Sequence, residues 1–340
     1  MLKKEEVLAQ SEAAFNQWAP IWDSHAKING EIYKEKGVRH KDVLYKGIGK
    51  QCICVSNGPS LEAQIEILKE NYNPELQYIA CVDKSLGTLV DAGLTPDLLI
   101  VCDASVDYET WMKPWEDATK DIMLGCCITA NPEWSKNWKG PICFFVNKDN
   151  IDSQIRYSQI SGCGEMIPAG SNVGNSVVIF TTQLMAFDEW LLIGYDYCWG
   201  EDNYYAYNDP AGKRHWMKHI QMIDQWGRIV NTSQNLLFSA RWLGDYYKMI
   251  VQEKGCNIYN CSGFGILNMP RLKFERKLKS FEKRKITDRE KQMIIMKKAD
   301  IATIRPDQGD EALQAELKKP VVDVTVRTIS TEDAAWLQAL

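Results

Sequence analysis

The fold is decided at residues 52–61, whose sequence is Cys-Ile-Cys-Val-Ser-Asn-Gly-Pro-Ser-Leu. Apolar residues of strand length (52–55) run into a turn of small and polar residues. From Leu61 on, apolar residues recur at helical spacing, at Ile65 and Leu68. A strand that passes through a tight turn into a helix is typical of a crossover between parallel strands. We therefore expect residues 52–61 to begin a parallel sheet.

Further apolar runs of strand length follow, and none of them alternates polar with apolar residues. They span residues 78–82, 98–102, 122–128, 142–146 and 190–193. Continuous apolar runs are typical of strands that are buried on both faces, as in a parallel sheet covered by helices. Residues 43–268 therefore predict an α/β, Rossmann-like domain, a mostly parallel sheet with helices on both faces.

Additions to this domain are expected at both ends, because 340 residues exceed the usual span of one core. Residues 1–42 carry Trp18 and Trp22 among charged residues, which predicts a helical N-terminal cap. Residues 269–340 predict a charged helix, over residues 272–299, and an acidic tail.

An aromatic and polar stretch interrupts the α/β pattern at about residues 198–232, and we expect it to form a lid. Tyr205 and Tyr207, with Trp199 nearby, have amphipathic rings that can stack on a base or hold a phosphate. Packing of the lid on the sheet is the structural alternative. A helix over residues 233–251 is expected to follow.

Composition narrows the class of protein. Hydrophobic residues make up 45% and charged residues 25%, which is ordinary globular usage, and the net charge of -5 disfavours general nucleic-acid binding. No apolar run has the length of a signal peptide's core or of a membrane span, so we expect a cytoplasmic protein without membrane contact. Most of the 11 cysteines lie in apolar runs, which predicts reduced core thiols.

The turn at residues 56–60 is the first candidate site, because ligands of such sheets bind beyond the carboxyl ends of the strands. Gly58 permits close approach of the backbone to a ligand, Pro59 presets the first helical turn, and free amides at a helix start favour an anion. With Ser56, Asn57 and Ser60, the turn predicts a phosphate site. The alternative is a purely structural turn with Ser60 as N-cap. The motif is neither G-x-G-x-x-G nor a P-loop.

Three aspartates are predicted at the same edge, because Asp83, Asp103 and Asp196 each follow an apolar run. Such carboxylates can accept ribose hydroxyls, hold Mg²⁺ or act as a general base. Singly, each could merely cap the following helix, and the cap is the favoured account of Asp83 alone. As a set, the three favour a functional role.

A second turn of small polar residues, 170–176, also opens a helix and can donate amides and hydroxyls to a ligand. Its members Ser171, Asn172, Gly174 and Asn175 are candidate contacts, and a flexible loop with a helix cap is the alternative. Further along, His215 and His219 are spaced to share a helix face, as a base or as metal ligands. No third ligand is evident, so we do not expect metal there.

These motifs resemble the 6-hydroxymethylpterin diphosphokinase MptE-like domain family, which includes motility-associated glycosyltransferases that modify flagellin with nonulosonic acids. The resemblance covers roughly residues 43–267. The Asn-Gly-Pro-Ser-Leu turn and the strand that leads into Gly-Tyr-Asp are also similar to those of bacterial sialyltransferases that use CMP-activated sugars. The resemblance to the family is carried by Cys54-Val55-Ser56-Asn57-Gly58-Pro59-Ser60-Leu61, Val82-Asp83, Gly93-Leu94-Thr95-Pro96-Asp97 before the strand ending in Asp103, and Leu192-Ile193-Gly194-Tyr195-Asp196.

The resemblance implies a role for each matching residue. Asn57, Gly58 and Ser60 would contact the donor's phosphate or ribose, and Asp83 and Asp103 would hold the nucleoside. The cytidine or phosphate side would be lined by residues 171–174, with Gly194 in the neighbouring motif. The leaving phosphate would be steadied by Tyr205 and Tyr207.

The chain departs from those sialyltransferases at their general base, because residues 227–234 contain no histidine. Asp103, Asp196 or His215 are the candidates for the catalytic role. Three hypotheses follow. The first is a glycosyltransferase with a CMP-nonulosonic acid donor and no required metal, and the second is a diphosphokinase that transfers pyrophosphate from ATP to a pterin alcohol with Mg²⁺ on Asp103 and Asp83. The third is a nucleotide-binding or structural module of the same fold that is catalytically inactive. The acceptor, a protein hydroxyl or a glycan, is not specified by the sequence.

Overall fold

The structure is a computed structural model that describes residues 4–148, 151–199, 205–206, 220–282, 284–288 and 290–291, with side chains from Trp18 on. Contacts divide the chain into a unit of Met1–Ile286 and a unit of Thr287–Leu340. All the elements below belong to the first unit. In the second, the amide and hydroxyl of Thr287 both donate to Glu290 Oε2, each at 2.8 Å.

The elements alternate between strands and helices through most of the chain. The strands are β1 (Gly37–Val38), β2 (Gln51–Val55), β3 (Gln77–Val82), β4 (Leu98–Val101), β5 (Met123–Cys127), β6 (Ile142–Lys148), β7 (Met166–Pro168), β8 (Glu189–Ile193), β9 (Ile220–Ile223), β10 (Ile229–Thr232) and β11 (Asn257–Asn260). The α-helices are α1 (Lys4–Lys36), α2 (His40–Val43), α3 (Leu61–Asn71), α4 (Leu86–Asp91), α5 (Tyr108–Trp111), α6 (Pro132–Asn137), α7 (Ile151–Ser161), α8 (Val173–Phe180), α9 (Gln234–Lys254) and α10 (Phe274–Lys279). Shorter helical turns are η1 (Asp83–Ser85), η2 (Lys113–Asp121) and the π-helical η3 (Thr181–Met185).

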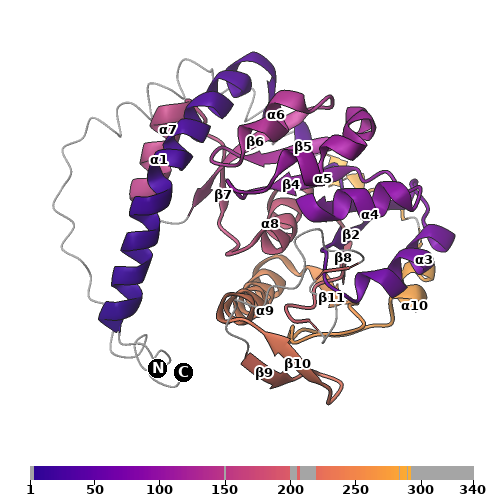
Figure 1. Cartoon of the computed structure of the whole chain (residues 1–340). Coiled ribbons are helices and arrows are strands. Elements are labelled where there is room, and N and C mark those ends of the chain that lie inside the picture. The colour runs from indigo at the N-terminus through magenta and orange to yellow at the C-terminus, as the bar shows by residue number, and fades with distance from the viewer. Residues whose placement is uncertain are drawn as a thin grey trace. The chain divides into compact units, whose positions relative to one another are not determined.

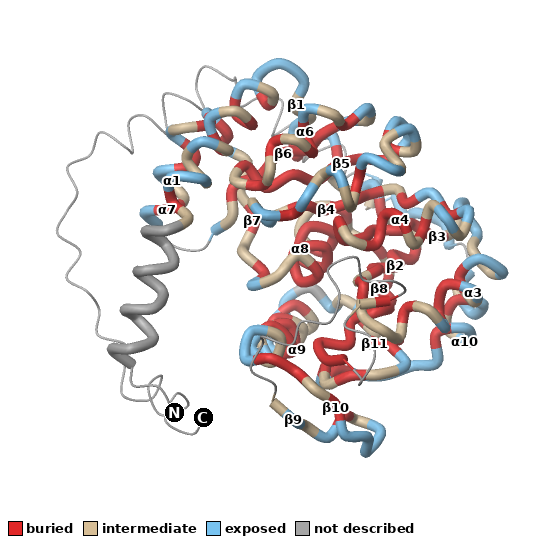
Figure 2. The backbone as a smooth tube through the Cα atoms, viewed as in Figure 1, coloured by how far each residue is buried: buried red, intermediate tan, exposed pale blue. Residues whose placement is uncertain are grey.

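A 9-stranded sheet runs through the centre of the first unit in the order β1-β6-β5-β4-β3-β2-β8-β11, with β7 also paired to β6 (Figure 1). Every pairing in it is parallel. All the predicted strands are present, and the α/β, mostly parallel, Rossmann-like fold is confirmed. Its strands are largely buried, as the red segments of Figure 2 show. That burial explains the continuous apolar runs.

The order of the strands changes direction at β2, because β3 to β6 extend to one side of it and β8 and β11 to the other. The register pairs Val55 with both Cys81 of β3 and Ile193 of β8, so these strands end at the same level. At such a switch point the connections diverge and leave a crevice beyond the carboxyl ends. The helix α8, which follows β7, packs on β2, β3 and β4 beside this crevice.

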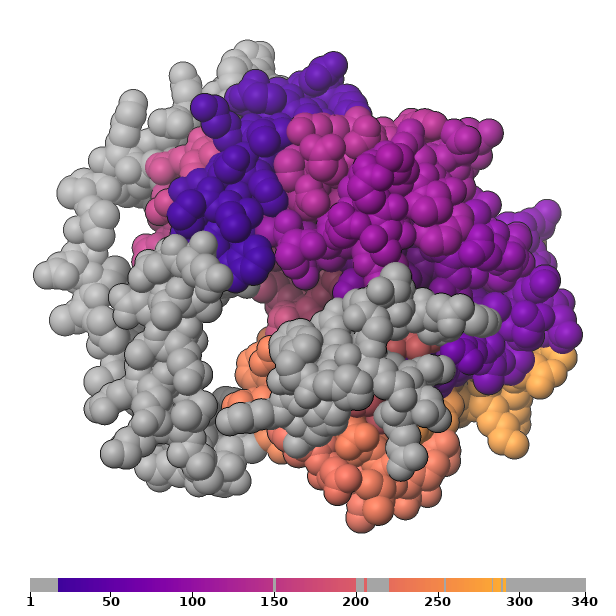
Figure 3. Space-filling model, in the orientation of Figure 1, coloured from indigo at the N-terminus to yellow at the C-terminus, as the bar shows by residue number. Residues whose placement is uncertain are grey.

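The N-terminal helix α1 lies against the end of the sheet that contains β6, and the space-filling view shows its indigo surface beside those of α6 and α7 (Figure 3). Buried Asn29 fixes it by donating to Ile128 O and Ala130 O, each at 2.9 Å. Arg156 of α7 pairs with Asp23 through two nitrogens. The predicted helical N-terminal cap is therefore present.

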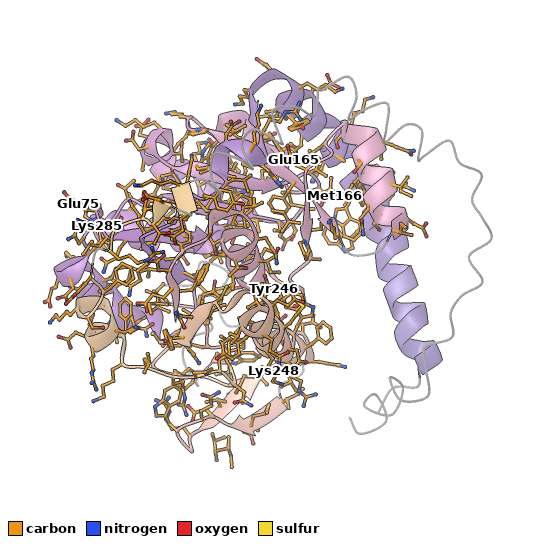
Figure 4. All side chains as sticks on the ribbon, turned by 180° about the vertical axis from the view of Figure 1, so that it is seen from behind. Glu75, Glu165, Met166, Tyr246, Lys248 and Lys285 are labelled. Atoms are coloured by element: carbon orange, nitrogen blue, oxygen red, sulfur yellow. The ribbon has the colours of Figure 1, made fainter. Side chains whose placement is uncertain are left out.

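The helix α9 is joined to the turn after α8 through Tyr246, which Figure 4 labels. Its hydroxyl lies 2.7 Å from Thr182 Oγ1 and accepts from Gln183 Nε2 at 3.0 Å, so it joins α9 to the π-helical turn after α8. The predicted helix over residues 233–251 is thus confirmed, with Ser233 as its N-cap.

The predicted helix over residues 272–299 is wrong in its described part. Helix is present at α10 and at residues 288, 290 and 291, whereas residues 281–282 and 284–287 between them are not helical, so the helix is not continuous. Phe274 and Leu278 bury one turn of α10, which packs on α3.

Two further expectations can be compared with the described residues. All 11 cysteines are free thiols, and most are buried, as predicted. Among the described helices, none combines the length and apolar character needed to cross a membrane. The domain boundaries at residues 42/43 and 268/269 stay predictions.

Candidate functional site

A cavity of about 490 Å³ lies in the crevice beyond the carboxyl ends of β2, β3, β4 and β8, next to the start of α8. Its position follows from the switch in strand order at β2. The predicted site residues that line it are Ser56, Asn57, Gly58, Asp83, Asp103, Ser171, Asn172, Gly174, Gly194, Asp196 and Tyr205. Tyr207 and His215 lie outside the described residues, as does His219. Pro59, Ser60 and Asn175 do not line the cavity.

The turn after β2 is held by its own protein neighbours. The Ser56 amide donates to Ile193 O and the Gly58 amide to Gly194 O, each at 2.9 Å. The Ser60 amide donates to Asp196 Oδ2 at 2.7 Å, and the Ser60 hydroxyl donates to Asp196 Oδ1 at 2.6 Å. Asp196 thus supplies the negative charge that the start of α3 attracts. The structure places a protein carboxylate where the sequence predicts a phosphate, and Ser60 does not act as a side-chain N-cap.

Gly58 is required for the contact between this turn and Asp196, rather than for contact with a ligand. A Cβ at Gly58 would lie 2.5 Å from Gly194 O and 2.6 Å from Asp196 Oδ2. Both distances are far shorter than van der Waals contact. The sequence predicts that Gly58 lets the backbone come close to a ligand. In the structure, the groups that come close to Gly58 are Gly194 and Asp196, which follow β8.

Asp196 is an ionisable group with an unusual pKa. Burial raises its pKa to about 7, against the hydrogen bonds from Ser60 and the nearby positive charge of Arg228, which lower it. Near neutral pH the carboxyl group therefore exchanges its proton readily, as a general base must. Asp196 lines the cavity, so this carboxyl group lies next to the space that a ligand would occupy.

Asp83 and Asp103 lie at the ends of the adjacent strands β3 and β4, as predicted. Asp83 is buried, and its Oδ1 accepts from the Lys84 amide at 2.7 Å while Oδ2 has no partner among the described residues. Burial raises the pKa of Asp83 to about 6, opposed by the Lys84 charge and amide and aided by Asp103. Asp103 is exposed, and its Oδ1 accepts from the amide and hydroxyl of Ser105, each at 2.8 Å.

Asp83→Asn is expected to stabilise the ligand-free protein at pH 8. Because the pKa of Asp83 is raised to about 6 in the folded state, the folded state binds the proton more tightly than the unfolded chain. Its stabilising contribution is therefore present below pH ~4 and is lost as the pH rises through ~6. The amide of Asn carries no charge at pH 8, so the variant avoids this loss, and its free energy of unfolding should be higher by at most about 2–3 kcal/mol. Urea unfolding should show that the variant's gain in free energy of unfolding over the natural protein is larger at pH 8 than at pH 4.5.

The control for this variant is Asp121→Asn, because Asp121 is exposed and lies outside the cavity. It makes the same change of charge and should leave the difference between the two pH values unaltered. A lower stability of Asp83→Asn than of the natural protein at pH 8 would contradict the prediction, since it would mean that the carboxylate is net stabilising.

The second turn, residues 170–176, places the start of α8 at the cavity. Asn172 is the N-cap, and its side chain accepts from the Asn175 amide at 2.8 Å. The amides of Val173 and Gly174 belong to the first helical turn and so have no partner within the helix, and both residues line the cavity. This helix start, rather than that of α3, therefore has amides at the cavity that make no bond within the helix.

The side chain of Asn175 makes hydrogen bonds to other parts of the protein. It is fully buried, its Nδ2 donates to Ser239 O of α9 at 3.0 Å, and its Oδ1 accepts from the Tyr197 hydroxyl at 2.5 Å. The side chain of Asn175 therefore orders the wall of the cavity from behind. Its predicted contact with a ligand stays a prediction.

Some residues on the cavity wall were missed by the sequence analysis. They are Lys84, Asn147, Tyr195 and Tyr197, among others. Lys84 directly follows Asp83, and Asn147 follows the apolar run that forms most of β6, so the rule that found the aspartates applies to both. Tyr195 and Tyr197 flank Asp196, and the Tyr195 hydroxyl donates to Gly174 O at 2.9 Å, which only the assembled sheet reveals.

Comparisons with known proteins agree with this architecture. The sequence matches the family model described as 6-hydroxymethylpterin diphosphokinase MptE-like over residues 28–202. The structure is similar to that of MAf glycosyltransferase from Magnetospirillum magneticum AMB-1, with a TM-score of 0.56 and 17% sequence identity over 86% of this chain and 45% of that chain. This chain thus spans less than half the length of that protein, and at this identity the likeness concerns the fold. No curated protein matches the sequence.

Proposed function

Because the chain belongs to the 6-hydroxymethylpterin diphosphokinase MptE-like family, we propose that it is a transferase that binds a nucleotide-linked donor in the cavity at the carboxyl edge of its sheet. The finer proposal is a glycosyltransferase that uses a CMP-activated nonulosonic acid. The fold shared with a glycosyltransferase supports it, as does a cavity of about 490 Å³, within the range of small-molecule sites.

The observation that carries the proposal is a set of buried oxygen atoms that lack hydrogen-bond partners among the described residues. They are Asn57 Oδ1, Asp83 Oδ2 and Asn147 Oδ1, and all three residues line the cavity. A buried acceptor without a donor costs about 1–3 kcal/mol, so such atoms are rarely left in this state. A nucleoside offers the missing donors as ribose hydroxyls and, in cytosine or adenine, an exocyclic amino group.

The phosphate of the donor is assigned to the start of α8. The amides of Val173 and Gly174 have no partner within the helix, and the positive end of the helix dipole lies with them. The corresponding position at α3 is filled by Asp196. This modifies the role that the sequence predicts for residues 56–60, which on this proposal hold the nucleoside through Asn57 and shape the crevice.

The chemical step consistent with this arrangement is a displacement at the anomeric carbon. The bond from that carbon to the phosphate oxygen breaks, its electron pair leaves with CMP, and the oxygen of an acceptor hydroxyl forms the new bond. Asp196 is the proposed acceptor of the hydroxyl proton, because its pKa of about 7 suits proton transfer at neutral pH. No metal is needed for this step.

A second candidate is the diphosphokinase reaction, favoured by the adjacent carboxylates of Asp83 and Asp103. Each would provide oxygen ligands for Mg²⁺, which usually takes one or two carboxylates together with substrate phosphates. Unpartnered Asp83 Oδ2 fits such a role, and the described residues contain no cluster of three metal-ligating side chains. When bound, Mg²⁺ would neutralise the phosphates of ATP.

Thermal-shift measurements with CMP, CDP, ATP and GTP, each with and without Mg²⁺, test the proposal. CMP at about 100 times its Kd is expected to stabilise the protein by about 2.7 kcal/mol, with or without Mg²⁺. A response to ATP alone that requires Mg²⁺ would favour the diphosphokinase. No response to any nucleotide would reject both, and binding of CMP without turnover of a CMP-sugar would favour an inactive module of this fold.

Asn57→Ala locates the binding in the cavity. Asn57 is buried, and its Oδ1 makes no hydrogen bond among the described residues, so its removal should cost little stability. The Kd of CMP should nevertheless rise about tenfold, as expected for the loss of one good hydrogen bond. Unchanged CMP affinity in a folded Asn57→Ala variant would place the nucleotide elsewhere.

A further inference from the structure

A lysine lines the cavity without an acidic partner. Lys84 Nζ lies 3.0 Å from the hydroxyl of Tyr205, and no carboxylate within the described ranges comes within salt-bridge distance of it. The residue is half-buried. An ammonium group carries three donors, and the contact with the Tyr205 hydroxyl accounts for one of them.

The position of Lys84 is fixed by its place in the fold. It belongs to the single turn η1 directly after β3, and its amide donates to Asp83 Oδ1 at 2.7 Å. The side chain then passes two aromatic rings, so that Nζ lies 4.7 Å from the ring centroid of Tyr205 and 5.5 Å from that of Trp111. These rings meet edge to face at 6.3 Å.

The aromatic rings hold the ammonium group without neutralising it. A cation over an aromatic face gains about 0.5–1 kcal/mol at exposed sites, which is enough to orient a side chain. It leaves the full positive charge available, unlike a carboxylate partner, which would compete with an anionic ligand. The neighbouring carboxylate of Asp83 does not replace such a ligand, because among the described residues it makes no salt bridge with Lys84 Nζ and contacts the Lys84 backbone amide instead.

We propose that Lys84 binds the phosphate of the donor and stabilises the charge that this phosphate gains when the glycosidic bond breaks. The inference rests on the proposed function. In a CMP-sugar the phosphodiester carries one negative charge, and the electron pair of the broken bond adds a second to the departing CMP. Lys84 therefore interacts more strongly with the departing group than with the intact donor, which is the requirement for lowering the barrier. Trp111 and Tyr205 are positioning residues.

Binding of CMP and of cytidine, measured by calorimetry on the natural protein and on Lys84→Met, tests the phosphate contact. Lys84→Met is expected to raise the Kd of CMP roughly 10–100-fold and that of cytidine less than about twofold, because only CMP has the phosphate. Lys84→Arg, which keeps the charge, should retain most of the CMP affinity. The charge-matched control is Lys69→Met, since Lys69 is exposed on α3 and outside the cavity.

The outcomes separate this inference from the proposed function. Equal CMP affinity in Lys84→Met and the natural protein, or equal losses of CMP and cytidine, overturns the phosphate contact while the nucleotide site stands. A loss of affinity for free N-acetylneuraminic acid, with CMP unaffected, also overturns it, because Lys84 would then bind the sugar's carboxylate. If the natural protein binds neither CMP nor cytidine, the proposed function fails. In that case, binding of inorganic pyrophosphate is measured instead. Binding to the natural protein that is lost in Lys84→Met supports an anion site at Lys84, whereas no binding to the natural protein rejects it.

Discussion

Gly58→Ala is expected to destabilise the protein by about 2–3 kcal/mol, the usual cost of forcing extra atoms into a packed site. Its Cβ would lie 2.5 Å from Gly194 O and 2.6 Å from Asp196 Oδ2. Neither neighbour retreats easily, because Gly194 O accepts from the Gly58 amide and Asp196 is held by Ser60. The turn after β2 must therefore move away from β8. Urea unfolding measures the loss, and CMP binding should weaken with it.

Gly164→Ala is the control for this substitution. A Cβ at Gly164 would meet no atom within 4 Å, and its backbone does not adopt a positive φ. Its stability should stay within about 0.5 kcal/mol of that of the natural protein. If Gly58→Ala proves equally harmless, the close approach of the turn to Asp196 is not part of the folded state.

Asp196→Asn is expected to abolish most turnover while the protein stays folded. The amide can preserve both contacts with Ser60, because its oxygen accepts from the Ser60 amide and its NH₂ group donates to the Ser60 hydroxyl. It cannot accept the proton of an acceptor hydroxyl. The loss of a general base typically lowers the rate by about 10²–10⁴-fold, and CMP affinity should change little. Release of CMP from CMP-N-acetylneuraminic acid in the presence of an acceptor hydroxyl measures this effect.

The pH dependence of the same rate provides an independent test. Because the pKa of Asp196 is raised to about 7, the rate should increase as the pH rises through that value and the carboxyl group loses its proton. The matched structural variant is Asp196→Ala, which leaves the Ser60 amide and hydroxyl without their acceptor and should also lose stability. Full turnover by Asp196→Asn would exclude Asp196 as the base and direct attention to Asp103 or His215.

The strands of the sheet were predictable because the signal for each is local. A buried strand between two helical layers has no polar residue to interrupt it, so the apolar runs ending at Val55, Val82 and Ile193 mark both the strands and their carboxyl ends. The short strands β1, β7 and β11 carry no such signal, since their pairing depends on neighbours along β6 and β8.

The site was predictable as a location but not as a set of contacts. Strand ends identified Asp83, Asp103 and Asp196 as residues of one sheet edge, and all three line the cavity. The same rule, applied only to acidic residues, passed over Lys84 and Asn147. Spacing alone also suggested that the amides after β2 bind a phosphate, whereas the Ser60 amide donates to the carboxylate of Asp196, which follows β8 and is 136 residues away in the chain.

The sequence by itself determined the long buried strands β2, β3, β4, β5, β6 and β8 and the residues at their carboxyl ends, because these properties depend on the pattern of neighbouring residues. Only the tertiary structure decided that β8 lies beside β2, which brings Asp196 to the start of α3 and leaves the start of α8 facing the cavity. It also decided which carboxyl groups have raised pKa values and that Lys84 meets aromatic rings instead of an acid. Burial and charge pairing are produced by segments distant in the chain, so no local pattern records them.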